Sequence, residues 1–355
     1  MSIEQKIEFC QSKDKFRKAF SSFVGDAKSI FIVHGHRSYQ SCGAKELVSE
    51  YTKRLNIIDF EDFTENPKME DVEKGVMSLR DADSDLIIAI GGGSAMDMAK
   101  LIRFYSHSNI KLLAIPTTAG TGAESTQFAV CYIDGVKHSI SDESILPEMV
   151  LLYPAFTHGN SRYLTSCTGF DALAQAIEAY WNINSNEESD KYAVEAISNI
   201  YPVLTKEKLS TQDRASLMKG ANLAGKAINI TRTTVPHALS YTLTSKYGYP
   251  HGHAVALTFP FFLKYNLEGN EERFKGTDFS QYAEKMDRLC SLLDIKGDPF
   301  LSMKGYIKQL GLNFDPMRDF NDSIVAQGIN LERAKNTPIA IDEEVILNAV
   351  KSIRN

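Results

Sequence analysis

The sequence lacks several features that mark secreted or membrane proteins. Its five cysteines are odd in number and far apart: Cys10, Cys42, Cys131, Cys167 and Cys290. This pattern favours reduced thiols in a cytoplasmic protein over a disulfide framework or a zinc knuckle. Residues 1–16 are polar and helix-like, and no run of about 18 apolar residues occurs anywhere. We therefore expect neither a signal peptide nor a membrane span.

The sequence also lacks an excess of positive charge. Its 39 lysines and arginines are scattered among 45 acidic residues, which gives a formal net charge of −6. Such a surface carries no electrostatic footprint for nucleic acid or anionic lipid. We expect a small-molecule partner, and neither nucleic acid nor membrane.

Two common nucleotide motifs are missing as well. Neither GxGxxG nor a loop ending in Gly-Lys-Ser or Gly-Lys-Thr occurs, which argues against an ordinary Rossmann dehydrogenase or an ATPase. In their place, an apolar strand over 86–90 leads into Gly91, Gly92, Gly93 and Ser94, and a helix is expected over 95–105. Three glycines let backbone amides approach an anion, and the helix amino terminus adds further N–H groups. The alternative is a glycine-rich turn that only connects strand and helix.

Ser94 and Asp97 also fit a helix capping pair at this turn. A second loop of small residues, 116–125, follows the next expected strand. It offers Thr117, Thr118 and Thr121 at the same edge of the sheet, where ligands of α/β proteins collect. We therefore predict that both loops bind a dinucleotide.

The two halves of the chain differ in their periodicity, and 355 residues suffice for about two domains. Short apolar runs at 29–33, 56–60, 86–90, 111–115 and 149–153 alternate with helical patterns, which indicates a buried parallel sheet. Residues 127–140 predict a hairpin that turns at Asp134 and Gly135. Later segments such as 171–181, 189–204, 213–228 and 279–293 have helical periodicity. We predict an α/β domain over 1–158 and an all-helical domain over 159–355.

The helical half holds a candidate metal site. Asp171 and Gln175 lie four residues apart on one helix face, with Glu178 one turn further. His237 and His251 follow, fourteen residues apart, with Tyr241 and His253 beside them in the sequence. A carboxylate and two imidazoles suit ferrous iron with coordination positions left open for substrate. Each histidine taken alone is more often structural.

Several motifs together resemble the iron-containing (group III) alcohol dehydrogenase family over nearly the whole chain. They are GGGSAMDMAK at 91–100, IPTTAGTGAE at 115–124, GFDALAQAIEAY at 169–180 and PHG at 250–252. The resemblance implies a dehydroquinate synthase-like fold, with a Rossmann-like dinucleotide-binding domain followed by a helical domain. It also implies NAD(P)H-linked reduction of an aldehyde, a metal held by Asp171, Gln175, His237 and His251, and a homodimer. Fe²⁺ is the expected ion and Zn²⁺ the alternative.

Three positions depart from the family pattern. Gln175 stands where relatives carry a histidine ligand, and Tyr241 replaces a histidine associated with proton relay. Gly35 replaces the aspartate that binds the ribose of NAD, while Arg37 adds a cation nearby. A cation near this ribose accommodates a 2′-phosphate, so we predict NADPH over NADH, with Lys137 also near the nucleotide. The alternative for Arg37 is a solvated surface position.

Gln175, Trp181 and residues 230–254 further resemble the hydroxyethylphosphonate dehydrogenase, or phosphonoacetaldehyde reductase, subgroup. Arg232, with Thr233, Thr234 and Lys246, would then supply donors to a phosphonate. The implied reaction reduces phosphonoacetaldehyde to 2-hydroxyethylphosphonate, with a proton from Tyr241, His253 or water. The alternatives are a generic short-chain alcohol dehydrogenase, a dehydroquinate synthase-like lyase, and a non-catalytic nucleotide sensor.

Overall fold

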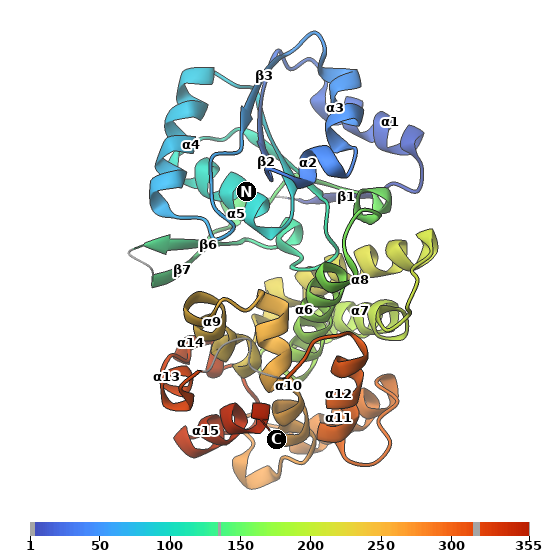
Figure 1. Ribbon diagram of the computed structural model, residues 1–355, viewed down its shortest axis with the longest axis vertical. Coiled ribbons are helices and arrows are strands. Elements are labelled where there is room, and N and C mark those ends of the chain that lie inside the picture. Colours follow the sequence, from blue (N-terminus) through green and yellow to red (C-terminus); the bar gives the residue numbers. More distant parts are fainter. Residues whose placement is uncertain (1–3, 134–135, 315–319, 355) are drawn as a thin grey trace. The chain divides into compact units, whose positions relative to one another are not determined.

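Six parallel strands form the sheet of the first part of the chain (Figure 1). The computed structural model describes residues 4–133, 136–314 and 320–354. The sheet has the order β1-β8-β5-β4-β2-β3, and a separate hairpin pairs β6 with β7. The strands are β1 Lys6–Phe9, β2 Ser29–His34, β3 Asn56–Phe60, β4 Leu86–Gly91, β5 Lys111–Pro116, β6 Phe128–Ile133, β7 Val136–Ser141 and β8 Met149–Leu152.

Helices cover both faces of this sheet, as its apolar strands require. The helices of the first part are α1 Lys13–Val24, α2 Ser38–Ser41, α3 Ala44–Thr52, α4 Met69–Ala82 and α5 Gly93–Tyr105. Figure 1 shows α1–α3 on one side of the sheet and α4 and α5 on the other. Every residue of β2 and β4 is buried. This three-layer arrangement is the predicted α/β fold.

The remaining helices form the second part of the chain. They are α6 Arg162–Trp181, α7 Glu187–Leu204, α8 Thr211–Thr231, α9 Val235–Tyr247, α10 His251–Leu267, α11 Phe279–Leu292, α12 Pro299–Gln309, α13 Asp322–Gln327, α14 Leu331–Ala334 and α15 Glu343–Lys351. Helix α6 packs against α7, α10 and α11, and every residue from Gly169 to Trp181 is buried. Trp181 stacks on Phe259 of α10, with ring centroids 5.7 Å apart. Among the described helices, none is both long and apolar enough to cross a bilayer.

Contacts divide the chain into two units. Unit 1 comprises residues 1–160 and 209–222, and unit 2 comprises 161–208 and 223–355. The first part of α8 therefore groups with the sheet. The domain boundary at 158/159 stays a prediction, because contacts within one chain do not establish which segments fold independently.

Two local predictions fail or fall outside the described chain. The helix-like start at residues 1–16 is wrong in part, because residues 6–9 form the edge strand β1 and pair with β8 from Lys6–Met149 to Phe9–Leu152. The predicted hairpin is present, but its turn residues Asp134 and Gly135 lie outside the described residues.

Candidate metal centre and nucleotide site

The candidate metal centre begins on α6. Ser161 caps this helix by accepting a hydrogen bond from the Leu164 amide. A helix buried on all sides must direct its polar side chains at partners inside the protein. Asp171 and Gln175, one turn apart, are 2% and 5% exposed. Both oxygen-bearing side chains are therefore held inside unit 2.

Two histidines from other helices meet Asp171. His237 lies in the first turn of α9, and His251 is the first residue of α10, directly after Pro250. Asp171 Oδ1 lies 3.1 Å from His237 Nε2 and 3.8 Å from His251 Nε2. One ligand atom from each of the three residues lies within 4.8 Å of the others. The residues that the sequence spacing singled out thus lie close enough together to hold a metal ion.

The other nitrogen of each imidazole has its own partner. His237 Nδ1 lies 2.5 Å from Glu178 Oε1, and His251 Nδ1 lies 3.4 Å from the hydroxyl of Ser240. That hydroxyl donates its proton to the carbonyl of His237, so its oxygen can accept from His251. Partners at both Nδ1 atoms leave both Nε2 atoms directed at Asp171, the arrangement that metal-binding histidines require.

The charges around His237 favour its protonated form. Complete burial lowers the pKa of the imidazole, but the carboxylates of Glu178 and Asp171 outweigh burial and raise it to about 10. A proton on Nε2 occupies the atom that would bind a cation. Metal binding at this centre therefore displaces a proton.

Gln175 fits the fourth ligand position. Its side-chain nitrogen donates to Asp171 Oδ2 over 3.4 Å, which fixes the orientation of the amide. Its oxygen Oε1 is buried and accepts no hydrogen bond from the residues that the structure describes. A buried polar atom without a partner is costly unless a ligand satisfies it. The donors present, two imidazoles, a carboxylate and an amide oxygen, suit a divalent transition metal.

The predicted proton donors occupy different surroundings. The ring of Tyr241 lies roughly parallel to that of His251, with centroids 6.3 Å apart. His253 points elsewhere: its Nε2 donates to the Asn313 carbonyl over 2.8 Å and its Nδ1 lies 2.9 Å from the Tyr163 hydroxyl. Burial lowers the pKa of His253. Both of its nitrogens are engaged, so Tyr241 is the better placed of the two.

Arg232 lies at the end of α6 away from Asp171. Its carbonyl accepts a hydrogen bond from Asn182, eleven residues after Asp171, which corresponds to about 16 Å along a helix axis. The residue has a φ of +68°, in the left-handed region. Its guanidinium pKa is lowered by burial and by nearby Arg333. Two other residues that were predicted to bind a phosphonate lie elsewhere. Thr234 donates a hydrogen bond to Glu178, and Lys246 lies in the last turn of α9.

The predicted nucleotide residues gather at the carboxyl edge of the sheet in unit 1. The Gly35 amide donates to the Ile90 carbonyl at the end of β4, and the Thr117 amide donates to the Gly91 carbonyl. A Cβ added at Gly92 would lie 3.4 Å from the Thr118 hydroxyl, and one at Gly93 would lie 3.0 Å from Thr121. Two loops and the start of α5 are therefore closely packed, most tightly at Gly93.

One prediction about this edge is wrong, and another falls outside the described residues. Helix α5 begins at Gly93 with Gly92 as its cap, so Ser94 and Asp97 are not a capping pair. The Ser94 hydroxyl instead contacts the Glu65 carbonyl, and Asp97 accepts from the Val130 amide of the hairpin. The side chain of Lys137 lies outside the described residues. Arg37 precedes the short helix α2 and lies two residues after Gly35.

Sequence reasoning missed a buried lysine in the glycine motif. Lys100 is completely buried, and its ammonium group donates to the carbonyls of Thr126 and Phe128 over 2.6 and 2.9 Å and also to Ala123. Burial lowers its pKa to about 8. The residue ties α5 to the loop that carries the predicted nucleotide-binding threonines. The signal in the sequence was a lysine with apolar neighbours on both sides, Met98 and Ala99 before it and Leu101 and Ile102 after it.

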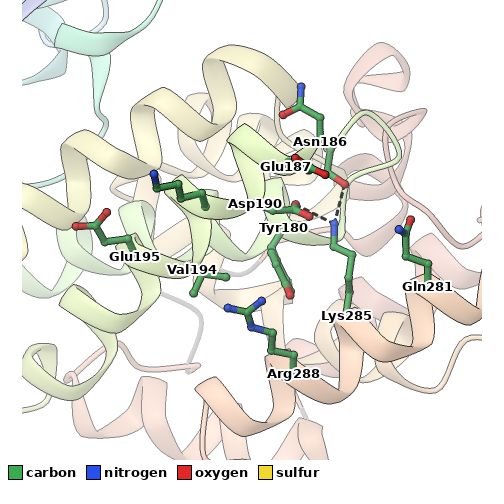
Figure 2. A pocket seen from close by; sticks show the side chains of 11 residues that line it. Tyr180, Asn186, Glu187, Asp190, Val194, Glu195, Gln281, Lys285 and Arg288 are labelled. Carbon is green, nitrogen blue, oxygen red and sulfur yellow. Dashed lines mark hydrogen bonds and ion pairs between the residues drawn. The ribbon is translucent and has the colours of Figure 1, made fainter.

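A second missed feature, which has no signal in the sequence, is a cleft of about 790 Å³ between α7 and α11 (Figure 2). Lys285 projects into it and bonds to Asp190 and Ser185, both over 2.8 Å. The same ammonium lies 4.7 Å from the centre of the Tyr180 ring. Lys285 and Asp190 are almost a hundred positions apart in the sequence, so no local pattern could indicate their contact.

Comparisons with known proteins agree with the motifs. The family model described as iron-containing alcohol dehydrogenase matches residues 9–154, and that of the Fe-containing alcohol dehydrogenase family, C-terminal, matches 165–299. An NADPH-dependent butanol dehydrogenase from Clostridium saccharobutylicum is 30% identical over 70% of each chain. A phosphonoacetaldehyde reductase from Streptomyces viridochromogenes is 29% identical over 75% of each chain.

Solved structures extend the likeness to the whole fold. An iron-containing alcohol dehydrogenase from Thermotoga maritima superposes with a TM-score of 0.83 at 27% identity, covering 99% of this chain and 98% of that one. In several curated relatives, however, the matched region spans less than two thirds of the relative's own length, and in one it spans 32%.

Proposed function

This chain belongs to the iron-containing alcohol dehydrogenase family, and from that premise we propose that it is a metal-dependent alcohol dehydrogenase that reduces a small aldehyde. The convergence of Asp171, His237 and His251 on one point carries the proposal. In the reaction the carbonyl carbon accepts a hydride from a reduced nicotinamide, and the oxygen accepts a proton. An alcohol and the oxidised cofactor result.

Asp171, His237 and His251 would hold the metal, with the amide oxygen of Gln175 as fourth ligand. When bound, a divalent cation polarises a carbonyl oxygen and stabilises the negative charge that develops on it. Fe²⁺ is the proposed ion and Zn²⁺ the alternative. An amide oxygen is a harder donor than imidazole, so Gln175 lessens the advantage that Zn²⁺ has over Fe²⁺ at sites rich in imidazole.

Tyr241 is the proposed proton donor to the alcohol oxygen. The support is that its ring lies roughly parallel to that of His251, with centroids 6.3 Å apart, and that a phenolic O–H can donate a proton. We retain His253 as a secondary candidate, since its Nδ1 faces the hydroxyl of the partly exposed Tyr163. Through that contact it could exchange protons with solvent.

NADPH is the proposed cofactor. The glycine turn at Gly91–Gly93 and the amino terminus of α5 would bind the diphosphate. Gly35 and Arg37 would admit and neutralise a 2′-phosphate. The name of the butanol dehydrogenase relative, which specifies NADPH, supports this choice.

Phosphonoacetaldehyde is the proposed substrate and 2-hydroxyethylphosphonate the product. The support is the phosphonoacetaldehyde reductase among the relatives, together with the half-buried guanidinium of Arg232. The position of the Arg232 backbone beyond Asn182 and the butanol dehydrogenase relative favour a second candidate, a generic short-chain alcohol dehydrogenase. We further propose a cytoplasmic homodimer.

A kinetic panel separates the two substrates. Phosphonoacetaldehyde and butanal are each reduced with NADPH or NADH by the wild type and by Arg232→Asn, since asparagine tolerates the left-handed backbone of this position. We expect the wild type to prefer NADPH. The KM for phosphonoacetaldehyde should be at least 10-fold higher in the variant, because the substitution removes about one charge-assisted hydrogen bond. Butanal should be unaffected, and Arg288→Asn, which removes an exposed arginine, is the control. An equal effect on both aldehydes would favour the generic enzyme.

A further inference from the structure

Behind His237 lies a chain of buried hydrogen bonds that ends at the only tryptophan of the protein. Trp181 Nε1 donates to the Thr234 hydroxyl over 3.1 Å, and that hydroxyl donates to Glu178 Oε2 over 2.7 Å. Glu178 Oε1 then lies 2.5 Å from His237 Nδ1. Trp181, Glu178 and Thr234 are at most 1% exposed. Water therefore cannot replace any of these partners.

The direction of each bond follows from the groups available. The indole nitrogen can only donate, so the single proton of the Thr234 hydroxyl is left for the carboxylate. The Thr234 amide also donates to Glu178 Oε2, over 2.6 Å. Because Oε2 already has two donors, Oε1 is the oxygen available to the imidazole. His237 is thereby held with its Nδ1 toward Glu178 and its Nε2 toward Asp171.

We propose that Glu178, Thr234 and Trp181 are positioning residues that set the affinity of the Asp171–His237–His251 cluster for a divalent cation. This inference rests on the proposed function, because it assumes that His237 Nε2 is a metal ligand. A carboxylate bonded to a ligating imidazole orients the ring and increases its basicity, and loss of such a partner weakens metal binding about 10- to 100-fold. Thr234 and Trp181 act one and two bonds further back, by fixing which carboxylate oxygen is free.

A purely structural role predicts a different result. Any buried carboxylate needs hydrogen-bond donors, so a loss of stability alone would not separate the two roles. Cation affinity does separate them, provided that a matched buried threonine is tested beside Thr234. Thr231 is such a residue: it is fully buried, and its hydroxyl donates to the carbonyls of Ala227 and Arg232 rather than to the carboxylate.

The experiment measures Co²⁺ and Zn²⁺ dissociation constants of the full-length metal-free protein by chelator competition. Thr234→Val removes the hydroxyl and keeps the amide, Thr234→Ser restores a hydroxyl, and Thr231→Val is the control. We expect Thr234→Val to bind both cations about 10- to 100-fold more weakly. Thr234→Ser and Thr231→Val should stay within about 3-fold of the wild type. Equal affinities for Thr234→Val and the wild type, or equal losses in the two valine variants, would overturn the inference.

Tryptophan emission gives a second readout. Because Trp181 is the sole tryptophan, Co²⁺ binding should change its emission in the wild type and in Thr231→Val, and the change should shrink in Thr234→Val. Should Thr234→Val fail to fold, Trp181→Phe removes only the indole donor and retains an aromatic ring against Phe259. It should weaken Co²⁺ binding by about 3-fold or more, and unchanged affinity would count against the inference.

His237→Ala distinguishes the inference from the function on which it rests. If His237→Ala loses Co²⁺ while Thr234→Val keeps it, only the positioning role fails. If His237→Ala binds Co²⁺ as tightly as the wild type, the proposed metal centre fails and the inference with it.

Discussion

Gly252 allows two helices to approach at the metal centre, and its replacement by alanine should move a metal ligand. It follows His251 in the first turn of α10. A Cβ added there would lie 2.8 Å from the carbonyl carbon of Cys167 and 3.0 Å from Asp171 Cβ, and closer still to the Cys167 carbonyl oxygen. Carbon atoms in contact normally lie about 3.5–4.0 Å apart. Helices α6 and α10 would therefore have to separate by about 1 Å.

That displacement is large for a metal site. Ligand distances must be correct to about 0.2 Å, so a shift of this size would carry His251 Nε2 away from its present position, 3.8 Å from Asp171 Oδ1. Overpacking of this kind costs about 1–3 kcal/mol. We expect Gly252→Ala to weaken Zn²⁺ binding at least 10-fold, and to lower the free energy of unfolding by an amount in that range.

Gly305→Ala is the matched control. Gly305 lies in helix α12, and no heavy atom lies within 4 Å of the position of its Cβ. Alanine there should leave Zn²⁺ affinity unchanged and raise stability slightly, by about 0.5–1 kcal/mol. Chelator competition measures the affinities and urea unfolding the stabilities. Wild-type Zn²⁺ affinity in Gly252→Ala would refute the claim that the close approach of the helices positions His251.

Two further predictions concern buried charges that are not among the proposed metal ligands. Burial lowers the pKa of Lys100 to about 8, below the value of about 10.4 in an unfolded chain, so between these values the unfolded chain binds a proton that the folded chain does not. The contribution of Lys100 to the free energy of unfolding should thus rise with pH by about 3 kcal/mol. Urea unfolding of the wild type and of Lys100→Met from pH 7 to 10.5 measures this change as the difference between the two free energies. Parallel pH profiles of the two proteins would contradict the prediction. At the cleft of Figure 2, Asp190→Asn or Lys285→Met alone leaves a partly buried charge without its partner, and each should cost about 2 kcal/mol. The double variant should cost at least about 1 kcal/mol less than the sum of the single changes, whereas additive costs would show that the pair contributes nothing.

The sequence predicted the parts of the fold that have a strong local signal. Apolar, β-branched runs identified β2, β4 and β5, because strands buried on both faces must be apolar throughout. β1 escaped because its four residues, Lys6–Phe9, include two charged side chains and lie at the edge of the sheet. Its pairing with β8 joins positions more than 140 residues apart, and no local pattern records such a pairing.

Part of the proposed metal centre was predictable, because helical spacing indicates which side chains share one face of a helix. Asp171, Gln175 and Glu178 share one face of α6 because they lie three and four residues apart. Arg232 shows the limit of this reasoning. It precedes His237 by only five residues, but its left-handed φ marks the turn between α8 and α9. Closeness in sequence across such a turn does not predict closeness in space.

Ser94 illustrates a different limit. Its serine-to-aspartate spacing matches a capping pair, yet the glycine turn lets α5 start earlier, at Gly93. The first amides of the helix therefore receive no side-chain cap at Gly92. A capped helix end would have used those donors, and an anion-binding end must leave them available. The failed prediction thus agrees better with a diphosphate site than the expected capping pair would have done.

The charges around His237 link the proposed metal centre to pH. Asp171 and Glu178 flank the His237 ring, and together they raise its pKa to about 10 against the opposing effect of burial. A protonated imidazole between two carboxylates satisfies all three buried groups. Cation and proton compete for the same atom, His237 Nε2, so the exchange preserves a positive charge between the carboxylates. It follows that cation affinity and pH are linked at this centre through an atom already held in place by Glu178.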